Sequence, residues 1–445
     1  MMSADSKTDA ERLSSHSERR CHGVSPVHLS EFEASVTDIS RAMTLPPKVY
    51  TDQAFYEFEI EAVWDRGWIC VGRVDQIPKP GDYFTKTLVG GEPVIVARDN
   101  QNGINVISAV CQHRGMCVMA PAKRLRADWF VPPPECSGNT GTFRCPYHWW
   151  TYDLRGRLIG APDMHHREGF DRSQIALPPL AVEVWQGFIF ASFDINAVPL
   201  APRLEKATKL LENYHLEEML STPLDVLSDV PFNWKLMVEN FMEGYHNDRL
   251  HHDLYDVARG DNPKSEEVLS GHIDFGYDPG DAAIIGRATT AFRDRGLNPT
   301  QRALFPAIET LAESERWQMV YFCVPPSLLV GVSTDSAFWF VLTPTGPESH
   351  ILSMSYVFPQ STTEMKLFQQ LFKQHVAGVD CFNNEDLAAN HATQIGLRSR
   401  FAPRGPLAKG DLFLVQFNSW LLDRYRESES RQANADKTAP SESIS

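Results

Sequence analysis

The chain has 445 residues, of which 42% are hydrophobic and 11% aromatic, enough for two globular domains with separate cores. Its net charge of −15 argues against nucleic acids and anionic membranes as partners, since both would repel it, while a basic electron-transfer partner stays compatible. No apolar run approaches the length of a membrane span and the first residues are polar, so we expect a cytoplasmic protein. Eight cysteines are too few for a disulfide scaffold, so close Cys spacings indicate metal binding.

Changes in residue composition along the chain predict two domains flanked by weakly ordered ends. Residues 1–45 and 429–445 are rich in Ser and charge, and we expect both segments to be disordered or loosely docked. Between 46 and 198, short apolar runs such as 94–96 alternate with Pro and Gly turns, which predicts a small antiparallel β domain. From 199 to 428, helical and strand-like patterns alternate, which predicts an α+β domain with helices packed on an antiparallel sheet.

Within the second domain, apolar periodicity predicts individual elements. Helical patterns cover 201–220, 233–250, 363–376 and 410–425, and strand-like runs cover 317–331, 336–343 and 350–358. Several aromatic residues on these strands are candidates for a substrate pocket or a cation-binding cage, although the hydrophobic core is the commoner place for them: Trp317, Tyr321, Phe338, Trp339 and Phe340.

Two mixed Cys/His pairs form the first candidate metal site. Cys111 and His113 make one pair, and Cys145 and His148 make the other. Such a set suits either a structural zinc ion or a [2Fe–2S] cluster with two Cys on one iron and two His on the other. Zinc sites usually pair Cys with Cys and His with His, whereas each pair here mixes the two. The mixed pairing favours the cluster, since each loop then gives one thiolate and one imidazole.

The helical pattern over 233–250 carries the second candidate site. Glu243 and His246 fall on one face of this pattern, and His251 or His252 can present a second imidazole if the helix loosens after the first. Two His and one carboxylate with open positions form the O₂-activating Fe(II) arrangement. Spacing alone does not locate the carboxylate, because it can come from any distant element.

The stretch from Trp68 to Pro162 resembles the Rieske domain of ring-hydroxylating oxygenase large subunits. The matching pieces include Pro80-Gly81-Asp82-Tyr83, Cys111-x-His113-Arg114-Gly115 and Cys145-Pro146-Tyr147-His148-x-Trp150-x-Tyr152. Two features depart from the family: the 31 residues between His113 and Cys145, about twice the usual spacing, and Trp149 in place of the usual Gly. We therefore expect an enlarged surface loop over 116–143, with Cys117 and Cys136 as bystander thiols.

The resemblance implies an N-terminal all-β Rieske domain that holds the [2Fe–2S] cluster, followed by a C-terminal helix-grip catalytic domain with one mononuclear Fe(II). It assigns the cluster to Cys111, His113, Cys145 and His148. It assigns the iron to His246, His251 and Asp386. Asp386 lies in the segment Glu385-Asp386-x₇-Gln394-x-Gly396-Leu397, where Glu385 and Asp380 are the fallback choices.

Two further residues receive catalytic roles from the same resemblance. Glu243 stands where the family usually has an acidic residue, most often Asp, that links a cluster His to an iron-ligand His. Glu at this position is shared by members similar to choline and carnitine monooxygenases. Asn240 on the same face would lie beside the iron and steer O₂ or water, or else serve as a buried amide satisfied by backbone.

The function implied is that of a terminal oxygenase, which uses O₂ and reductase-supplied electrons to hydroxylate or dihydroxylate an aromatic or other apolar substrate. The alternative is a monooxygenase that dealkylates or hydroxylates a small amine or quaternary ammonium compound. The chain has no dinucleotide-binding motif, so we expect a separate NAD(P)H reductase, with or without a ferredoxin. The resemblance also implies an α₃ or α₃β₃ assembly. A respiratory Rieske protein and a zinc-stabilised module are the rival classes, and visible colour separates the latter.

Overall fold

The computed structural model describes residues 23–118, 136–251, 280–289 and 304–438. The expected loop over 116–143 falls largely outside this part of the chain, as does His252. The described residues form two compact units, one of Asp65–Val198 and one of residues 23–64 together with 199–438.

The first unit consists of short antiparallel strands in three sheets, ordered β1-β10-β9, β4-β3-β2-β5 and β6-β7-β8. The strands are β1 (Ile69–Arg73), β2 (Asp82–Thr87), β3 (Pro93–Arg98), β4 (Ile104–Ser108), β5 (Ser137–Asn139), β6 (Phe143–Arg144), β7 (Thr151–Tyr152), β8 (Leu158–Gly160), β9 (Ala181–Trp185) and β10 (Phe188–Ser192). Short 3-10 turns connect some of them: η4 (Val74–Gln76), η5 (Val89–Gly91), η6 (Met164–His166) and η7 (Arg172–Gln174).

A hydrophobic core joins the sheets of the first unit to its Cys loops. The β-branched run of β3 is fully buried, as a strand covered on both faces requires. Cys111 and Cys145 belong to the same buried cluster as Ile95, Phe143 and Tyr152. The loops that begin at these two cysteines are therefore held by packing against the sheets rather than free at the surface.

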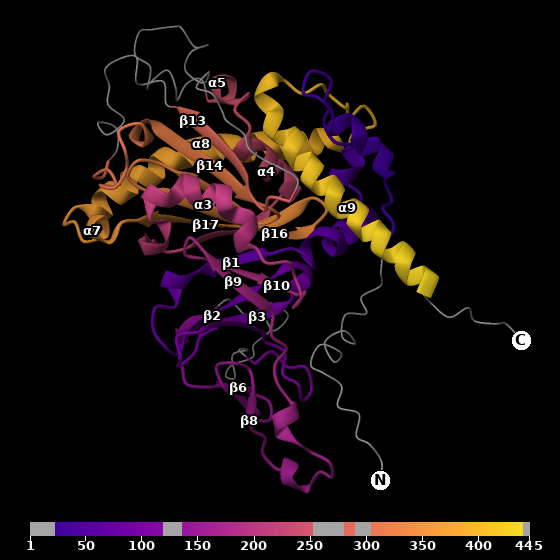
Figure 1. Cartoon of the computed structure of the whole chain (residues 1–445), viewed down its shortest axis with the longest axis vertical. Helices are drawn as coiled ribbons and strands as arrows, with labels where there is room; N and C mark the ends of the chain where they lie inside the picture. The colour runs from indigo at the N-terminus through magenta and orange to yellow at the C-terminus, as the bar shows by residue number, and fades with distance from the viewer. Residues whose placement is uncertain (1–22, 119–135, 252–279, 290–303, 439–445) are drawn as a thin grey trace, which may run out of the picture. The chain divides into compact units, whose positions relative to one another are not determined.

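The second unit is built on a seven-stranded antiparallel sheet, ordered β11-β17-β16-β15-β14-β13, with β12 also paired to β17 (Figure 1). Its strands are β11 (Leu220–Ser221), β12 (Asp225–Val230), β13 (Ile284–Thr289), β14 (Gln318–Val324), β15 (Leu328–Val332), β16 (Ala337–Gly346) and β17 (Ser349–Phe358). Its helices are α2 (Gln53–Glu59), α3 (Glu205–Leu211), α4 (Trp234–Met242), α5 (Asn247–Leu250), α7 (Gln360–Thr363), α8 (Phe368–Leu397) and α9 (Leu412–Thr438). Shorter turns are η1 (Leu29–Ser35), η2 (Pro47–Tyr50), the π turn η3 (Ile60–Trp64), η8 (Ala201–Leu204), η9 (Glu212–Tyr214), η10 (Leu216–Glu218), η14 (Glu315–Trp317) and η15 (Lys409–Asp411). These two units confirm the α+β class.

Helix α4 is the central element of the second unit, because it contacts strands β14 and β16, α8 and α9. Its N-terminus is capped by Asn233, whose side chain accepts a hydrogen bond from the backbone N–H of Lys235. The buried amide of Gln394 on α8 accepts from the backbone N–H of Asn233 at 2.9 Å and donates to the carbonyl of Tyr50 at 3.2 Å. The start of α4 is thus fastened to the last turn of α8.

The segment 23–64 packs with the second unit, whereas the sequence placed residues 46–64 in the first domain and 1–45 in a weakly ordered end. Phe32, Phe55 and Phe58 are all buried and surround the ring of Tyr425 on α9, with centroids 5.4–5.5 Å away. Aromatic burial of this kind orders a segment whose composition alone suggests a loose end. Helix α9 likewise continues to Thr438, into the tail expected to be disordered.

Three further helices differ from the sequence prediction. Of the helix expected over 201–220, only Glu205–Leu211 is α-helical, flanked by 3-10 turns. The helix expected over 363–376 begins at Phe368 and continues to Leu397. Its later turns bury Asn383, Asn390 and Gln394, so the apolar periodicity that predicts a helix is missing there. The helix expected over 233–250 is broken after Met242, and Glu243 is extended, with φ −94° and ψ 148°.

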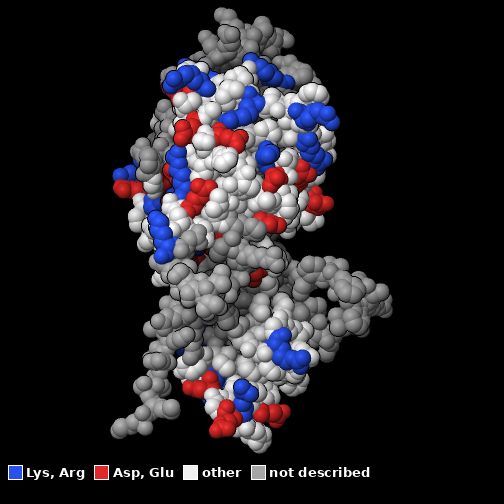
Figure 2. Space-filling model, turned by 90° about the vertical axis from the view of Figure 1, so that its right-hand side faces the viewer, with Lys and Arg blue, Asp and Glu red and all other residues white. Residues whose placement is uncertain are grey.

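Charged side chains of both signs are interspersed over the described surface of the second unit in the view of Figure 2. The acidic excess of the chain is therefore not gathered into one broad field on that face. Among the helices of the described residues, none is long and apolar enough to cross a membrane.

Two candidate metal centres

The two Cys loops of the first unit share one backbone geometry. The N–H of Gly115 donates to the carbonyl of Cys111 at 2.9 Å, and the N–H of Trp149 donates to the carbonyl of Cys145 at 3.0 Å. Gly115 and Trp149 are both left-handed, with φ of 75° and 62°. The position that the family usually gives to Gly thus requires a conformation that glycine adopts freely, and here a tryptophan adopts it.

The thiols at the start of these loops lie in the core of the unit. Cys111 and Cys145 are each 2% exposed, and the Tyr152 hydroxyl lies 3.2 Å from the Sγ of Cys111. Burial and the neighbouring Cys111 thiol raise the pKa of Cys145. Loss of the proton from either of two adjacent buried thiols is unfavourable without a metal. A bound metal stabilises the thiolates that it requires as ligands.

The imidazoles of the same loops lie beside each other. The rings of His113 and His148 have centroids 4.6 Å apart, and His113 stacks on Trp150 at 4.7 Å. The Nδ1 atom of His113 is buried without a hydrogen-bond partner among the described residues, which fits a nitrogen that ligates a metal. Burial, with the charges of His148 and Arg114, lowers the pKa of His113 and favours the neutral, metal-binding ring.

The arrangement of the four side chains fits a two-iron cluster better than a zinc ion. No three of their ligand atoms lie within 4.8 Å of one another among the described residues, whereas a single tetrahedral ion would gather them. A close thiol pair and a close imidazole pair match the two irons of a Rieske cluster. Cys136 accepts a contact from the Thr85 hydroxyl at 3.6 Å and joins neither pair, as expected of a bystander thiol.

The end of α4 orients the first imidazole of the second centre. The carboxylate of Glu243 accepts hydrogen bonds from the backbone N–H groups of Tyr245 and His246 and from the His246 Nδ1 atom. These bonds close the backbone into a tight turn after the helix, which is why α4 cannot continue through Glu243. The turn leaves the Nε2 atom of His246 free to face α8.

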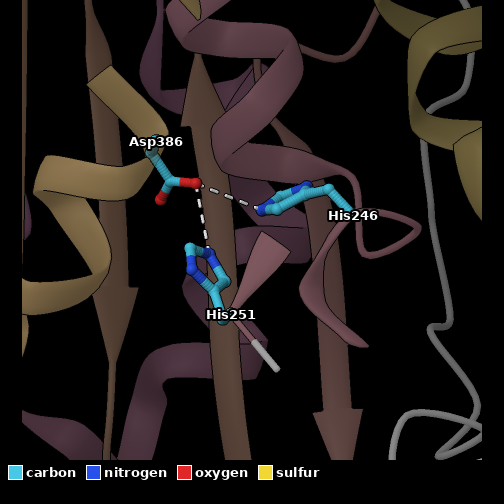
Figure 3. Close-up of side chains that lie close together, drawn as sticks. All are labelled: His246, His251 and Asp386. Carbon is cyan, nitrogen blue, oxygen red and sulfur yellow. Dashed lines mark ion pairs between the residues drawn. The ribbon is translucent and has the colours of Figure 1, made fainter. Parts of the chain in front are cut away.

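His246, His251 and Asp386 come together at this point, with their ligand atoms all within 4.8 Å of one another. The Oδ1 atom of Asp386 lies 3.4 Å from Nε2 of His246 and 3.2 Å from Nε2 of His251. Figure 3 shows Asp386 on its helix pointing toward both imidazoles. Two His and one carboxylate that face one common point form the ligand set of a non-haem Fe(II) site.

A second set of side chains supports this triad. The Oε2 atom of Glu385 lies 2.7 Å from Nδ1 of His251, and the Nδ2 group of Asn240 donates to Oδ1 of Asp386 at 3.2 Å. Each imidazole is therefore held through Nδ1 by a carboxylate while its Nε2 faces Asp386, as is usual for metal-ligating histidines. Glu385, a fallback ligand by sequence, lies behind His251 instead, and its supporting role was not anticipated.

The charge of the centre favours a cation. Burial of the His246 ring lowers its pKa, but the hydrogen bonds and charges of Asp386 and Glu243 outweigh this and raise the pKa to about 9. Without a metal, a proton on His246 thus offsets the surrounding carboxylates. A divalent ion would do the same between the three ligand atoms.

Four of the five aromatic residues predicted for a pocket divide into two groups, and the side chain of Trp317 lies outside the described part of the structure. Tyr321, Phe338 and Phe340 meet the ring of Phe241 on α4, with centroids 5.5–5.9 Å apart. Trp339 points to the opposite face of β16 and is buried. The sequence reasoning missed Phe241, although its place directly after Asn240 is a usable signal. The aromatic cluster thus begins one residue from an amide that contacts Asp386.

Comparisons with known proteins agree with both centres. Residues 67–181 match the Rieske [2Fe-2S] domain, and residues 210–427 match the catalytic domain of the ring hydroxylating alpha subunit. These domains define the class of Rieske-type oxygenase subunits, with a [2Fe–2S] cluster and a mononuclear iron. The chain therefore has a Rieske domain and the catalytic domain of a ring hydroxylating alpha subunit.

The individual relatives include subunits of a monooxygenase and of a dioxygenase. The carnitine monooxygenase oxygenase subunit of Acinetobacter pittii (strain PHEA-2) is 30% identical over 221 residues, which are 49% of this chain and 56% of that protein. The benzene 1,2-dioxygenase subunit alpha of Pseudomonas putida is 29% identical over 321 residues, 66% and 67% of the two chains. A quaternary ammonium Rieske monooxygenase, whose structure concerns carnitine oxidation and inter-subunit electron transfer, shares the fold, with TM-score 0.67 and 21% identity over 90% of this chain and 99% of that one. The chain thus spans little more than half of the carnitine monooxygenase subunit.

Proposed function

We propose that this chain is a terminal oxygenase that uses O₂ and reductase-supplied electrons to hydroxylate or dihydroxylate an aromatic or other apolar organic substrate. The observation that carries the proposal is the convergence of His246 and His251, at the two ends of α5, with Asp386 on α8. These three side chains would hold an Fe(II) ion, which would supply O₂ activation, and Cys111, His113, Cys145 and His148 would hold the [2Fe–2S] cluster that supplies the electrons.

Residues around the triad have distinct tasks in this proposal. Glu243 and Glu385 hold the two imidazoles through their Nδ1 atoms, so that both Nε2 atoms stay directed at one point. Asn240 donates to Oδ1 of Asp386, the same oxygen that faces both imidazoles, and so fixes the direction of that carboxylate. In this proposal Glu243, which ends α4, also takes part in the transfer of electrons to His246.

The aromatic cluster beside Asn240 supports the proposed substrate class. Phe241, Tyr321, Phe338 and Phe340 present apolar ring faces and edges to one another. Such surfaces bind planar apolar molecules through burial and edge-to-face contacts. A small quaternary ammonium compound is the second candidate, because aromatic faces also attract cations and Glu243 replaces the Asp commoner in the family.

The electron source is a separate protein in this proposal. An NAD(P)H reductase, with or without a ferredoxin, would reduce the cluster, and the chain would work as a homotrimer or α₃β₃ assembly. Support comes from the match to the catalytic domain of ring hydroxylating alpha subunits and from the inter-subunit electron transfer described for a protein of the same fold.

Metal analysis of anaerobically purified protein tests the proposal. We expect the iron and acid-labile sulfide of one [2Fe–2S] cluster, one further iron per chain, and a Rieske-type EPR signal after reduction by dithionite. Zinc in a colourless protein would overturn it. With both centres present, product analysis on benzene-type arenes and on carnitine-type trimethylammonium compounds, under the same reductase, separates the two substrate classes.

A further inference from the structure

The sheet of the second unit has an incompletely filled region beside the aromatic cluster. Met354 and Tyr356 on β17 are partly exposed. Leu352 and Phe358, the positions before and after them on the same face of the strand, are fully buried. Phe338, the cross-strand partner of Tyr356 on β16, is partly exposed as well. The buried core is thus interrupted along the middle of these two strands.

A glycine makes room for the ring of Phe338 in this region. Gly331 on β15 is paired with Phe338, and a Cβ atom at Gly331 would lie 2.4 Å from Cζ of that ring. The ring therefore lies over the glycine, where any larger residue would push it away from the sheet. The same ring contacts Phe241 on α4, with centroids 5.9 Å apart. The interrupted part of the core is thus bordered by aromatic surface, against which a planar ring can be buried.

Asn383 brings one amide group to this aromatic region. It lies on α8 three residues before Asp386, so the two side chains are neighbours on one helix face, with a rise of about 4.5 Å between them. The side chain of Asn383 is 9% exposed, and among the described residues its only hydrogen bond is donated to the Sδ atom of Met354, at 3.5 Å. A thioether is a weak acceptor. The buried amide would therefore gain from a stronger acceptor.

The charge around Asn383 limits the kind of acceptor that fits. Asp380 and Asp386 lie three residues before and after it, and α8 has no Lys or Arg from residue 374 to residue 397. Burial and the charge of Asp380 raise the pKa of Tyr356, which indicates that this carboxylate is close to the partly exposed part of β17. An anionic substituent would be repelled here, whereas a neutral oxygen would not. A trimethylammonium group has no atom that accepts a hydrogen bond.

We propose that Asn383 determines substrate specificity by donating a hydrogen bond to a neutral oxygen, such as that of a ketone or an ether, on the aromatic ring of the substrate. The inference rests on the proposed function, because it narrows the aromatic substrates of that function to those that carry such a group. The ring of the substrate lies against Phe338 in this proposal, and its oxygen lies one helical turn from Asp386. A buried polar group that only the correct substrate satisfies is an effective basis for discrimination.

The test measures the binding of three probes of nearly equal shape to the full, metal-loaded chain. Acetophenone carries a neutral oxygen, α-methylstyrene carries no oxygen and benzoate carries a charged carboxylate. Calorimetry without O₂ or reductant gives the Kd of each, and we expect the wild type to bind acetophenone most tightly. Asn383→Leu and Asn383→Asp both keep the shape of the side chain without its donor. We expect each to weaken acetophenone binding roughly 5- to 10-fold and to leave that of α-methylstyrene within about twofold. Asn384→Leu, at the exposed neighbouring position of α8, is the matched control.

Several results would overturn the proposal. Equal weakening of acetophenone and α-methylstyrene binding would mean that Asn383 only supports the fold. A wild type that binds the three probes equally, prefers benzoate or binds none of them would contradict the substrate class. In the active enzyme, the Asn383 variants should raise KM for acetophenone more than they lower kcat. A failure of the proposed function is a separate result, in which iron and sulfide are missing. The order of the three Kd values would still decide the role of Asn383, because this residue is not a candidate metal ligand.

Discussion

Glu243 makes three hydrogen bonds within one turn of chain, and these bonds determine where the His246 ring points. A carboxylate differs from an amide here because it accepts all three and carries charge next to the ring. The residue is thus a positioning group for His246 whatever else it contacts.

The first prediction concerns this carboxylate. We expect Glu243→Gln to retain both metals and to slow electron transfer from the cluster about 10- to 100-fold, since the amide holds the ring less firmly and without charge. Stopped-flow reoxidation of the reduced cluster by O₂ with substrate measures the rate. Glu217→Gln on the exposed turn η10 is the control. A Glu243→Gln variant with normal reoxidation would remove this residue from the electron path.

His350 provides a pH-dependent prediction on stability. It is fully buried, its Nδ1–H donates to the carbonyl of Phe232 at 2.9 Å, and burial lowers its pKa to about 4. The unfolded chain takes up a proton at the ordinary pKa of about 6.5, so the unfolded state binds more protons below that pH. The stability from neutral His350 is complete above about pH 6.5 and is lost as the pH falls toward 4.

The expected loss for this single group is about 2 kcal/mol in the free energy of unfolding between about pH 7 and pH 5. Urea unfolding of wild type and His350→Asn at several pH values measures it, because the difference between the two proteins removes all other titrations. Parallel pH profiles would show that the folded ring titrates normally.

Helices α2, α4 and α9 are joined by a buried ion pair rather than by apolar contact alone. Lys235 and Glu59 are both fully buried, with Nζ–Oε2 at 2.8 Å, and Glu59 also accepts hydrogen bonds from Trp234 and Tyr425. Burial lowers the pKa of Lys235 although Glu59 opposes this. The pair fixes which face of α4 is turned toward the N-terminal segment and, by consequence, which face carries Asn240 to α8.

Removal of one partner should therefore be far more damaging than loss of a surface pair. We expect Lys235→Met to lower the free energy of unfolding by about 3–5 kcal/mol, because Glu59 is left charged and unpaired. Lys206 pairs with Asp281 at the surface, and the lysine side chain is 48% exposed. We expect Lys206→Met to change the free energy of unfolding by about 1 kcal/mol or less. Denaturant unfolding of the two variants compares them, and equal effects would contradict the role assigned to burial.

The elements also show what the sequence can predict. The Cys/His spacing in two loops predicted one complete centre, because all four residues lie in short segments with their own signature. Asp386 was reached only through a family resemblance, since nothing local distinguishes it from the acidic residues around it. The later half of α8 escaped prediction because its inward face buries Asn383, Asn390 and Gln394, which carry no apolar period. Segment 23–64 was misplaced because its partner, α9, lies at the other end of the chain.

The described residues form two candidate metal centres, one in each of two compact units. Each centre takes all its candidate ligands from one unit, Cys111 and Cys145 from the first and His246 and Asp386 from the second. The two metals should therefore be lost independently of each other.

A pair of variants tests this independence. His113→Ala should abolish the cluster absorbance and leave the second unit folded with its iron, because none of its core residues is changed. His246→Ala should keep the cluster and lose the mononuclear iron and turnover. Metal analysis, visible spectra and circular dichroism of both proteins provide the measurement, and a fully active His246→Ala enzyme would refute the assignment of the iron.

The hydrogen bond between Gln394 and the start of α4 couples the affinity for the iron to the position of α8 along α4. Asp386 and Gln394 lie eight residues apart on α8, about 12 Å along its axis, and each contacts α4, one through Asn240 and one through Asn233. Two attachments on the same pair of helices oppose sliding of α8 by a turn. A substitution at Gln394, far from any ligand atom, would therefore alter how tightly the iron is held, and iron binding would in turn stabilise that register.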